Sequence, residues 1–477
     1  MINKDAFKNT FFAGFSFTPT PDQQRLVDTL AEFIANGNER EALLIRGYAG
    51  TGKTKIIAEL SNTLPSFKMR SVLLAPTGRA AKVLANYANR PALTIHRKIY
   101  KKDASPEGGI IFSLAPNLHK NTLFIVDEAS MIGESTSGEG AYNNLLGDLL
   151  EYVFTGENCK LILVGDTAQL PPVGSALSPA LNKDYLHSNY FIGVKECELR
   201  NVVRQKDVSG VLHNATKLRI QLLENPDAFP VFETAPDVVR IDGTELEDAL
   251  NDAYRNYGYK DTLVICRSNK RANAYNQQIR FRIKWQENEL SAGDLMMVVK
   301  NNYFWLDEKS GAGFIANGDG IEVLKVQSIR ELYGFRFADV TFRLMDYPNE
   351  PDMQGVLLLD TLAAETPALT QEQNKALFAN IMEDYADEPI KRNRYLLLKQ
   401  NPYFNALQIK FSYAVTCHKA QGGQWPCIFI DQGYFTEDMM NAEYLRWLYT
   451  AFTRATEKVY LVNFNEKFFG GEKKEYI

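Results

Sequence analysis

Short, fully apolar runs alternate with helix-like segments along much of the chain. The first series includes VLLAP (72–76), LFIVD (123–127) and LILVGD (161–166), and each run closes with a polar residue or a proline. A second series begins with TLVICRS (262–268) and continues through FSYAVTCHKAQG, PCIFID and KVYLV. Uniformly apolar runs of this length are typical of parallel strands buried on both faces. The pattern therefore predicts an α/β protein with two mononucleotide-binding-like halves, whose ligands lie at the carboxyl ends of the strands.

One stretch, residues 286–404, breaks this pattern. It contains short alternating runs, a turn-forming ANGDG (316–320) and then polar helical segments. Alternation with period two and glycine turns favours a small β-rich unit. We therefore predict an inserted β-rich domain with a helical extension over 286–404, a first domain over 1–200, and a second built from 201–285 and 405–477.

The segment TPTPDQQRLVDTLAEFI reads as a helix with a marked start. Thr20 suits the N-cap, Pro21 the first helical position, and Gln23 the place where a capping box takes Glu or Gln. Two roles for Gln23 stay open. The local pattern favours the cap, and the alternative is recognition of a nucleotide base by the side-chain amide.

The run GYAGTGKT, from Gly47 to Thr54, follows the apolar ALLI and precedes a helical IIAEL. It fits G-x-x-x-x-G-K-[ST] in the strand–loop–helix setting that this motif requires. Glycines let backbone N–H groups turn toward phosphate oxygens, and the following helix presents its positive end to the same anion. Lys53 is expected to reach the β- and γ-phosphates and Thr54 to help hold Mg²⁺. The predicted residues of the loop that bind a nucleoside triphosphate are Gly47, Gly50, Thr51, Gly52, Lys53 and Thr54.

Two further strand ends carry polar groups of the kind that nucleotide hydrolysis needs. LFIVDEAS delivers Asp127, a candidate Mg²⁺ ligand, and Glu128, a candidate general base for the attacking water. LVGDTAQLPPVG places Asp166 and Gln169 at the end of the next strand, beside the expected γ-phosphate. Adjacent carboxylates at a strand end can also be a solvated turn, but their position after a buried run favours catalysis.

Composition indicates the class of protein and its cellular environment but not its function. No apolar run approaches the roughly 18 residues that span a bilayer, and the first thirty residues lack the pattern of a signal peptide. The five cysteines are scattered without a C-x-x-C, which argues against a zinc site or a disulfide framework and fits a reducing cytosol. The net charge of −5 means that any nucleic-acid surface is local.

Eight motifs in order together resemble the superfamily 1B DNA helicases. They are GYAGTGKT, APTGRAAKVL, TIH, DEAS, GDTAQLPPVG, VVRQ, VTCHKAQG and YTAFTRA. The sequence is most similar to the RecD-like and phage Dda-like branch, with the Pif family as a cousin, from about Thr20 to Val462. The resemblance implies two RecA-like motor domains with ATP and Mg²⁺ as cofactors.

The resemblance also implies roles around the nucleotide. Gln23 matches the glutamine that reads adenine, and Gln169 the residue that couples the γ-phosphate to the DNA-binding surface. Arg204 in VVRQ and Arg454 in YTAFTRA match the arginines that reach the γ-phosphate from the second motor domain. The alternative for either arginine is a surface ion pair.

Residues matching the family's contacts to single-stranded DNA are spread over both halves. They are Thr77, Thr94, His96, Thr416 and His418, with Gln421 and Gly422 linking the DNA and nucleotide sites. Hydroxyls and backbone amides at strand ends can hold phosphates without a large basic patch, which reconciles DNA binding with an acidic chain.

Two regions correspond to accessory elements of the family. Residues 97–120 occupy the place of the small 1B element with its strand-separating pin, and KIYKKDASPEGGIIF reads as a hairpin on which Tyr100 or Phe112 could meet the duplex. An exposed hairpin without a role is the alternative. The insert resembles the SH3-like 2B domain, with a tower-like extension from Thr366 to about Asn401. Aromatic residues 303–305 fit core packing better than base stacking.

The family relationship implies a monomeric, ATP-dependent helicase that moves 5′-to-3′ on single-stranded DNA and unwinds duplex junctions, with single-strand-binding or repair proteins as partners. Three alternatives remain at the level of sequence. They are a translocase that displaces proteins and unwinds poorly, a motor acting on RNA, and a non-catalytic module with a degenerate nucleotide fold. The intact Lys53, Asp127 and Arg454 argue against the last of these.

Overall fold

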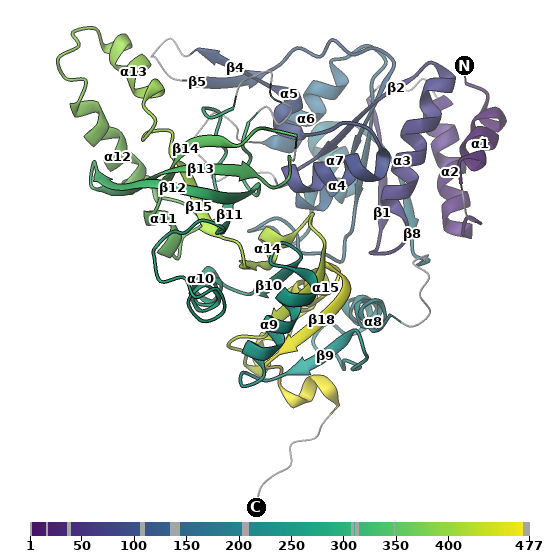
Figure 1. The fold of residues 1–477 in the computed structure, drawn as a ribbon. Coiled ribbons are helices and arrows are strands. Elements are labelled where there is room, and N and C mark those ends of the chain that lie inside the picture. The colour runs from purple at the N-terminus through teal and green to yellow at the C-terminus, as the bar shows by residue number, and fades with distance from the viewer. Residues whose placement is uncertain are drawn as a thin grey trace, which may run out of the picture. The chain divides into compact units, whose positions relative to one another are not determined.

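The structure is a computed structural model in which the chain divides into two compact units (Figure 1). Unit 1 comprises Met1–Asp103 and Ile111–Val208, and unit 2 comprises Ala104–Ile110 and Ser209–Ile477. The described residues are 2–15, 18–35, 40–104, 110–133, 144–202, 209–306, 310, 314–347 and 349–470, with only the backbone described at 102–104 and 110–112.

Unit 1 contains a parallel sheet of order β3-β2-β6-β7-β1-β8. Its strands are β1 (Glu41–Gly47), β2 (Arg70–Ala75), β3 (Ala92–Thr94), β6 (Thr122–Val126), β7 (Lys160–Gly165) and β8 (Gly193–Leu199). These include the apolar runs of the first predicted series, so the prediction of buried parallel strands is confirmed here. Because all six strands run the same way, their carboxyl ends lie along one edge of the sheet.

Helices cover both faces of this sheet, as its uniformly apolar strands require. On β1, Leu43 and Ile45 pack with helices α1, α2 and α3, whereas Ala42 and Leu44 pack with α6. The helices of unit 1 are α1 (Lys4–Ala13), α2 (Pro21–Ala35), α3 (Lys53–Thr63), α4 (Gly78–Ala88), α5 (Ile95–Ile99), α6 (Leu145–Phe154) and α7 (Lys183–Tyr190), with 3-10 turns η1 (Leu64–Phe67), η2 (Ala129–Met131) and η3 (Pro179–Leu181). The helix predicted after Thr20 is α2.

The predicted hairpin near residue 100 is present. Strands β4 (Tyr100–Ala104) and β5 (Ile110–Leu114) pair as a two-stranded sheet. At its base the Tyr100 hydroxyl donates to Asp148 Oδ2 at 2.6 Å, so this phenol is engaged with α6. Phe112 lies on β5, but its side chain and the hairpin tip, 105–109, lie outside the described part.

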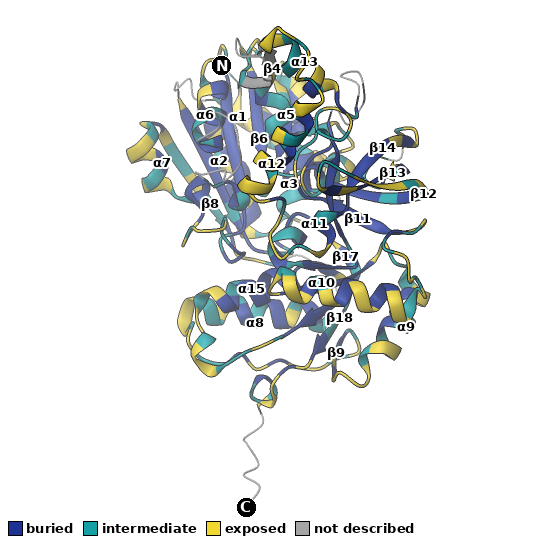
Figure 2. Cartoon of the chain, turned by 90° about the vertical axis from the view of Figure 1, so that its left-hand side faces the viewer, coloured by how far each residue is buried: buried dark blue, intermediate teal, exposed yellow. Residues whose placement is uncertain are grey.

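Unit 2 contains a second parallel sheet, of order β16-β10-β17-β18-β9. Its strands are β9 (Val238–Ile241), β10 (Thr262–Cys266), β16 (Ala414–Thr416), β17 (Trp425–Asp431) and β18 (Ala455–Val462). The associated helices are α8 (Gly210–Glu224), α9 (Leu246–Tyr257), α10 (Asn269–Gln278), α14 (Cys417–Ala420) and α15 (Ala442–Phe452), with 3-10 turns η5 (Glu437–Met439) and η6 (Glu466–Phe469). A π-helical turn, η4 (Ile279–Ile283), extends α10. Strand β17 is almost wholly buried and β18 has two exposed residues near its start, whereas α10 alternates buried and exposed positions (Figure 2).

A closed five-stranded barrel interrupts the second half, as the alternating pattern predicts. Its strands are β11 (Leu295–Val298), β12 (Gly320–Leu332), β13 (Phe335–Leu344), β14 (Met353–Leu358) and β15 (Leu407–Phe411). The fifth strand, β15, lies beyond the predicted insert of 286–404 and closes the barrel by pairing with β11 and β14. The helices of this region are α11 (Asp360–Ala363), α12 (Gln371–Glu383) and α13 (Lys391–Gln400), and the last two pack on β13 and β14.

The barrel and the second parallel sheet share one hydrophobic core. A single cluster of buried side chains includes Val264 and Phe429 of the sheet together with Met296 and Val340 of the barrel. The insert is therefore built onto the sheet through continuous packing. Of the aromatics predicted to pack in the core, Trp305 packs against the buried clusters and donates its indole N–H to Asn405 O at 2.8 Å. Tyr303 is half-buried, and the prediction is wrong for Phe304, which is exposed. Within the described ranges, none of the helices has both the length and the apolar character of a membrane span.

Candidate active site

The loop between β1 and α3 has the tight backbone that a phosphate cradle needs. Gly50 and Gly52 adopt φ of 79° and 86°, in the left-handed region that favours glycine. A Cβ on Gly47 would stand 2.9 Å from Thr51 Oγ1, so this glycine allows the loop to close. The Thr51 hydroxyl donates to Tyr48 O at 2.8 Å. The loop is thus held by its own hydrogen bonds.

Lys53, the first residue of α3, points back into this loop. Its Nζ donates to Gly47 O at 2.5 Å and to Tyr48 O at 2.8 Å. The ammonium group therefore lies inside the curve of the loop, where a phosphate would sit. Carbonyl oxygens are weaker partners for an ammonium than phosphate oxygens are, so an incoming triphosphate can displace them.

Gln23 performs the capping role and also contacts the loop. Its Oε1 accepts from Thr20 N at 3.0 Å, and Thr20 Oγ1 accepts from Gln23 N at 3.3 Å, which completes the capping box. The Nε2 group donates to Thr51 O at 3.1 Å. A Cβ on Gly52 would meet this Nε2 at 3.0 Å. The side chain is therefore buried between the start of α2 and the phosphate loop.

Asp127 and Thr54 are brought together although 73 residues separate them. The Thr54 hydroxyl donates to Asp127 Oδ2 at 3.4 Å, and Glu128 N donates to Asp127 Oδ1 at 2.9 Å. Burial and the adjacent Glu128 carboxylate raise the pKa of Asp127 to about 7, against the opposing effect of Lys53. Among the described residues no cationic side chain pairs with this carboxylate, and a hydroxyl beside such a carboxylate is a suitable ligand pair for a hard divalent cation.

Glu128 itself has an unusual backbone. Its φ of 53° and ψ of 34° lie in the left-handed region, which a residue with a long side chain seldom adopts. This left-handed conformation turns the chain sharply after β6. Asp127 and Glu128 therefore differ in their surroundings although they are adjacent. Asp127 is buried and Glu128 is half-buried. Such outliers cluster at functional sites.

The end of β7 supplies Asp166 and Gln169, both buried. Asp166 Oδ1 accepts from Ala168 N at 2.9 Å, which shapes the turn leading to Gln169. In the parallel sheet β7 lies between β6 and β1. Gln169 therefore leaves the same sheet edge as Asp127 and the phosphate loop.

One anchoring residue at this edge was missed at the level of sequence. Asp22 is buried, and its Oδ2 accepts from Arg200 N at 2.8 Å and Asn201 N at 3.0 Å. It ties the end of the β8 segment to the start of α2, beside Gln23. In the sequence Asp22 reads only as an acidic residue of a helical first turn. Arg204 lies outside the described residues.

The residues of unit 1 that are candidates for contacting single-stranded DNA lie at the same carboxyl edge of the sheet. Thr77 and Thr94 are N-caps, and their hydroxyls accept from Ala80 N and Arg97 N, each at 3.2 Å. β2 and β3 pair in register up to Ala75 and Thr94. Both threonines thus open short helices beside the nucleotide edge.

His96 follows Thr94 in the first turn of α5. Burial lowers the pKa of His96, with a smaller opposing effect from Asp148. Its ring lies 5.7 Å from that of Tyr100 at the base of the hairpin. A neutral imidazole can donate or accept a hydrogen bond but brings no charge to a phosphate.

Unit 2 presents an analogous short motif. Thr416 ends β16 and is the N-cap of α14, in which burial lowers the pKa of His418. Gln421 is buried, and Gly422 turns the chain with φ of 74°. The four residues lie in the connection from β16 through α14 to β17 of the second sheet, whereas Thr94 and His96 lie where β3 of the first sheet passes through α5 to the hairpin strand β4.

Arg454 is a buried side chain with neutral partners. Its guanidinium donates to Thr450 O, Gly423 O and Thr453 Oγ1, each at 3.2 Å. Among the residues that the structure describes, Arg454 makes no ion pair with a carboxylate. The surface ion pair considered as its alternative role is therefore not what holds this arginine. A buried guanidinium without a counter-ion is suited to an anionic ligand.

The arrangement in unit 1 thus combines an anion cradle, an ammonium group, a hydroxyl–carboxylate pair and an adjacent second carboxylate. No cluster of three or more His, Cys, Asp or Glu suited to a metal occurs in the described ranges. A cation held by Thr54 and Asp127 would therefore need phosphate oxygens and water to complete its shell, as Mg²⁺ at nucleotides does.

Comparisons with known proteins agree with this geometry. The family model of the AAA domain matches residues 19–225, and that of the UvrD-like helicase C-terminal domain matches residues 411–462. The first match covers the phosphate loop, Asp127 and Gln169. The second covers the Thr416–Gly422 motif and Arg454.

Two characterised relatives are helicases. The chain is 37% identical over 138 residues to the ATP-dependent RecD2 DNA helicase of Deinococcus radiodurans, which is 28% of this chain and 17% of that protein. It is 24% identical over 272 residues to the ATP-dependent DNA helicase dda of Enterobacteria phage T4, covering 54% of this chain and 56% of that protein. These matches confirm the resemblance to the RecD-like and Dda-like branch.

Two further likenesses extend over nearly the whole chain. An uncharacterized protein, R530, of Acanthamoeba polyphaga mimivirus is 23% identical over 92% of this chain and 98% of its own length. A solved structure of Pif1 helicases at forked double-stranded DNA aligns over 96% of this chain and 95% of its own, at 15% identity with a TM-score of 0.47.

Proposed function

We propose that this chain, a relative of the RecD-like and Dda-like helicases, is an ATP-dependent DNA helicase that translocates 5′-to-3′ on single-stranded DNA and unwinds duplex. The observation that carries the proposal is the pairing of Thr54 with Asp127 beside a closed phosphate loop. That pairing brings together the phosphate-binding loop and the acidic strand end, the two parts that nucleotide hydrolysis requires. The motifs TIH, HKAQG and YTAFTRA, which match the helicase family, favour a nucleic-acid motor over a nucleotide kinase.

In the proposed reaction the loop amides and Lys53 hold the β- and γ-phosphates of ATP, while Gln23 faces the adenine side of the loop. Thr54 and Asp127 would hold Mg²⁺, which neutralises developing phosphate charge when bound. The burial-raised pKa of Asp127 supports this role, because a cation would restore the ionised carboxylate that burial disfavours. Glu128 is the proposed base that orients and deprotonates the attacking water.

In the proposal, Gln169, Arg204 and Arg454 couple ATP hydrolysis to movement along the DNA. Gln169 senses the γ-phosphate from the end of β7. Arg454 and Arg204 stabilise the charge of the transferring phosphoryl group, a contribution of roughly 10³–10⁵ in rate for arginine fingers. The absence of a carboxylate partner for Arg454, among the described residues, supports its assignment to an anion.

The proposed grip on DNA is divided between the two units. Thr77, Thr94 and His96 serve unit 1, and the Thr416–Gly422 motif serves unit 2. Both histidines have pKa values lowered by burial, so we expect them to act as neutral hydrogen-bonding or stacking groups. The grip then depends little on charge, in keeping with the acidic chain.

The accessory elements complete the proposal. The two parallel sheets are RecA-like domains 1A (1–200) and 2A (201–285 and 405–477, apart from the barrel strand β15). The β4–β5 hairpin is the 1B element with the strand-separating pin, and the barrel with α12 and α13 is the SH3-like 2B insertion. The chain acts as a monomer on junctions of single- and double-stranded DNA, with single-strand-binding or repair proteins as partners.

The test is ATP-dependent unwinding of two matched partial duplexes, one with a 5′ single-stranded tail and one with a 3′ tail. Unwinding from the 5′ tail alone, lost in Lys53→Ala, is the expected result. Unwinding from the 3′ tail alone would refute the polarity. Strand-stimulated hydrolysis without unwinding of either duplex would favour the protein-displacing translocase, for which an engaged Tyr100 at the hairpin base is a specific reason. An RNA-tailed duplex tests the third candidate.

A further inference from the structure

A basic and aromatic segment, RFRIKW (280–285), joins α10 to the barrel. It begins within the π-helical turn η4. Both of its aromatic side chains are exposed to solvent, Phe281 at 57% and Trp285 at 84%. All four tryptophans of the chain are described, and Trp285 is the only one classed as exposed. Exposed aromatic side chains on which bases stack are characteristic of proteins that bind single-stranded nucleic acid.

The backbone at Trp285 is strained. Its φ is 55°, in the left-handed region where a bulky aromatic residue is a genuine outlier. Glycine or asparagine would end a helix in this conformation without the strain. The preceding π-helical turn is itself a rare feature that concentrates at functional sites. A tryptophan kept in this conformation, in water, therefore points to a ligand.

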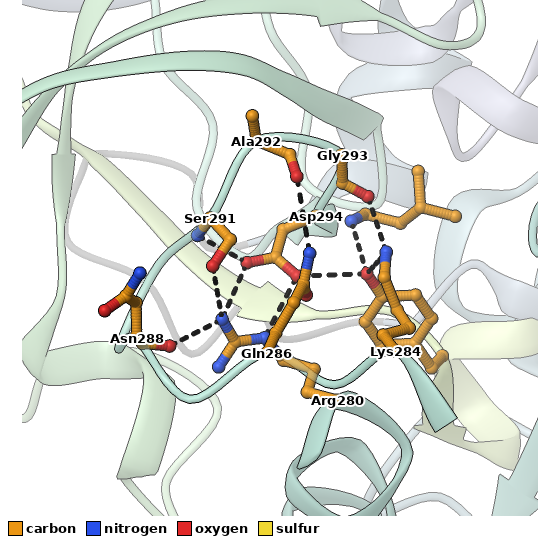
Figure 3. A network of polar contacts seen from close by, with 10 residues as sticks. Arg280, Lys284, Gln286, Asn288, Ser291, Ala292, Gly293 and Asp294 are labelled. Atoms are coloured by element: carbon orange, nitrogen blue, oxygen red, sulfur yellow. Dashed lines mark hydrogen bonds and ion pairs between the residues drawn. The ribbon is translucent and has the colours of Figure 1, made fainter. Parts of the chain in front are cut away.

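A polar network centred on the buried Arg280–Asp294 pair holds this strained turn in place (Figure 3). Arg280 makes two hydrogen bonds to Asp294, at 3.0 and 2.9 Å, and donates to Asn288 O at 2.8 Å. Lys284, the residue before Trp285, donates to Gly293 O at 2.7 Å. Gln286, the residue after it, donates its backbone N–H to Arg280 O at 2.9 Å. Both chain neighbours of Trp285 are thereby fixed.

The same network reaches the candidate DNA-contact motif of unit 2. Lys284 Nζ donates to the Tyr413 hydroxyl at 2.7 Å, and that hydroxyl donates to Asp294 Oδ1 at 3.1 Å. Tyr413 directly precedes β16, which ends at Thr416. The support of Trp285 is thus continuous with the strand that carries the proposed DNA contacts.

We propose that Phe281 and Trp285 form a stacking site for bases of the single-stranded DNA on which the motor moves. The proposal rests on the proposed function. Residues 280–294 carry three basic and three acidic side chains, so the segment is neutral overall. A neutral aromatic surface binds through the π-face of a base, which every base has, and not through phosphate charge. The contact is therefore independent of sequence and adds little to the salt dependence of binding.

The first experiment follows the fluorescence of the full chain during titration with oligo-dT. We expect quenching of the emission that acrylamide can reach, and loss of most of this quenching in Trp285→Phe. The strand-stimulated ATPase of the wild type is measured in parallel. If ATPase is stimulated while the emission stays unchanged at saturating oligo-dT, the stacking site is refuted and the motor stands. If oligo-dT binds and stimulates nothing, the proposed function fails.

The second experiment compares Trp285→Ala with Phe191→Ala by oligo-dT binding at several salt concentrations. Phe191 is a matched control because it is also 84% exposed with a φ of 52°, but it follows α7 in unit 1. Trp285→Ala should weaken binding about fivefold or more with the salt slope unchanged. Phe191→Ala should bind as the wild type does. Equal affinities for both variants would overturn the proposal.

A third variant separates function from structure. Trp285→Gly relieves the left-handed strain, so we expect its melting temperature to equal or exceed that of the wild type while oligo-dT binding weakens as in Trp285→Ala. A lowered melting temperature with wild-type affinity would mean that the indole serves folding, and would contradict the proposal.

Discussion

Two buried aspartates, Asp127 and Asp431, occupy corresponding places in the two halves of this protein and have opposite surroundings. Asp127 follows β6 of the first sheet, and Asp431 ends β17 of the second. Asp431 accepts from Arg271 at 2.8 and 3.0 Å and from the Tyr275 hydroxyl at 2.8 Å. Asp127 accepts only from Thr54 and its neighbour's backbone N–H among the described residues.

The difference separates a structural carboxylate from a functional one. The Asp431 carboxylate raises the pKa of the Arg271 guanidinium, which is the mark of a satisfied ion pair. Burial and the adjacent Glu128 carboxylate instead raise the pKa of Asp127 to about 7, and among the described residues no cationic side chain pairs with it. A buried acid kept without such a partner destabilises the fold. We interpret that instability as the reason that Asp127 binds an external cation with the nucleotide.

The largest effect expected from this comparison is on catalysis. Asp127→Asn should lower ATP hydrolysis by about 10³-fold, as removal of a group that stabilises transition-state charge does. Asp431→Asn should leave hydrolysis per folded molecule near the wild-type value. Steady-state rates, normalised to the folded fraction from circular dichroism, provide the measurement. Similar losses in both variants would remove the distinction.

The free energy of unfolding should respond in the reverse order, with the larger loss in Asp431→Asn. Asp431→Asn leaves the partly buried Arg271 without its carboxylate and should destabilise unit 2 by about 2 to 4 kcal/mol. Asp339→Asn is the matched control, because Asp339 pairs with Arg330 at 3.1 Å on the barrel surface, where such pairs contribute about 1 kcal/mol or less. Urea denaturation followed by the buried Trp425 and Trp447 tests the pair. Equal losses of unfolding free energy in the two variants would mean that the Asp431–Arg271 pair contributes no more than a surface ion pair.

A pH dependence should sharpen the contrast further. The folded-state pKa of Asp127 is raised, so its protonated form stabilises the fold fully below the unfolded value near 3.8, and this contribution is lost as pH rises through about 7. Asp127→Asn lacks this loss. The stability advantage of Asp127→Asn over the wild type, without nucleotide, should therefore grow by about 2 kcal/mol between about pH 5.5 and 8.5. An advantage independent of pH would contradict the raised pKa.

The smallest effect concerns Gln23, which serves both the cap of α2 and the phosphate loop. Gln23→Ala should destabilise unit 1 by about 1 kcal/mol through loss of the capping box. If the amide also reads adenine, the KM for ATP should rise while the KM for GTP changes little. Thr370, whose capping box with Gln373 opens α12, supplies the control variant Gln373→Ala. Equal changes of KM for both nucleotides would leave Gln23 with the cap and loop alone.

The features that could be predicted from sequence depend on contiguous residues. The apolar strands named in the sequence, the phosphate loop and the start of α2 each follow from short runs of the chain, whereas the edge strands β3, β8 and β9 were not predicted. Even the two open roles of Gln23 could be named, because one depends on local capping geometry. The contact from Gln23 to Thr51 confirms that cap and loop share the side chain.

The features that escaped prediction depend on distant pairings. Nothing local to Asp431 indicates that Arg271, 160 residues earlier, neutralises it. The closing strand β15 carries no sign that it joins the barrel instead of the sheet that follows, because both environments are buried. Trp285 reads as an ordinary apolar residue until its exposure and backbone are known.

The most direct test of the account is the rate of ATP hydrolysis with and without oligo-dT, measured for the wild type, Asp127→Asn and Asp431→Asn. The account predicts hydrolysis that oligo-dT stimulates in the wild type and in folded Asp431→Asn, and that Asp127→Asn lacks under both conditions. Hydrolysis that survives Asp127→Asn, or that no nucleic acid stimulates, would contradict it.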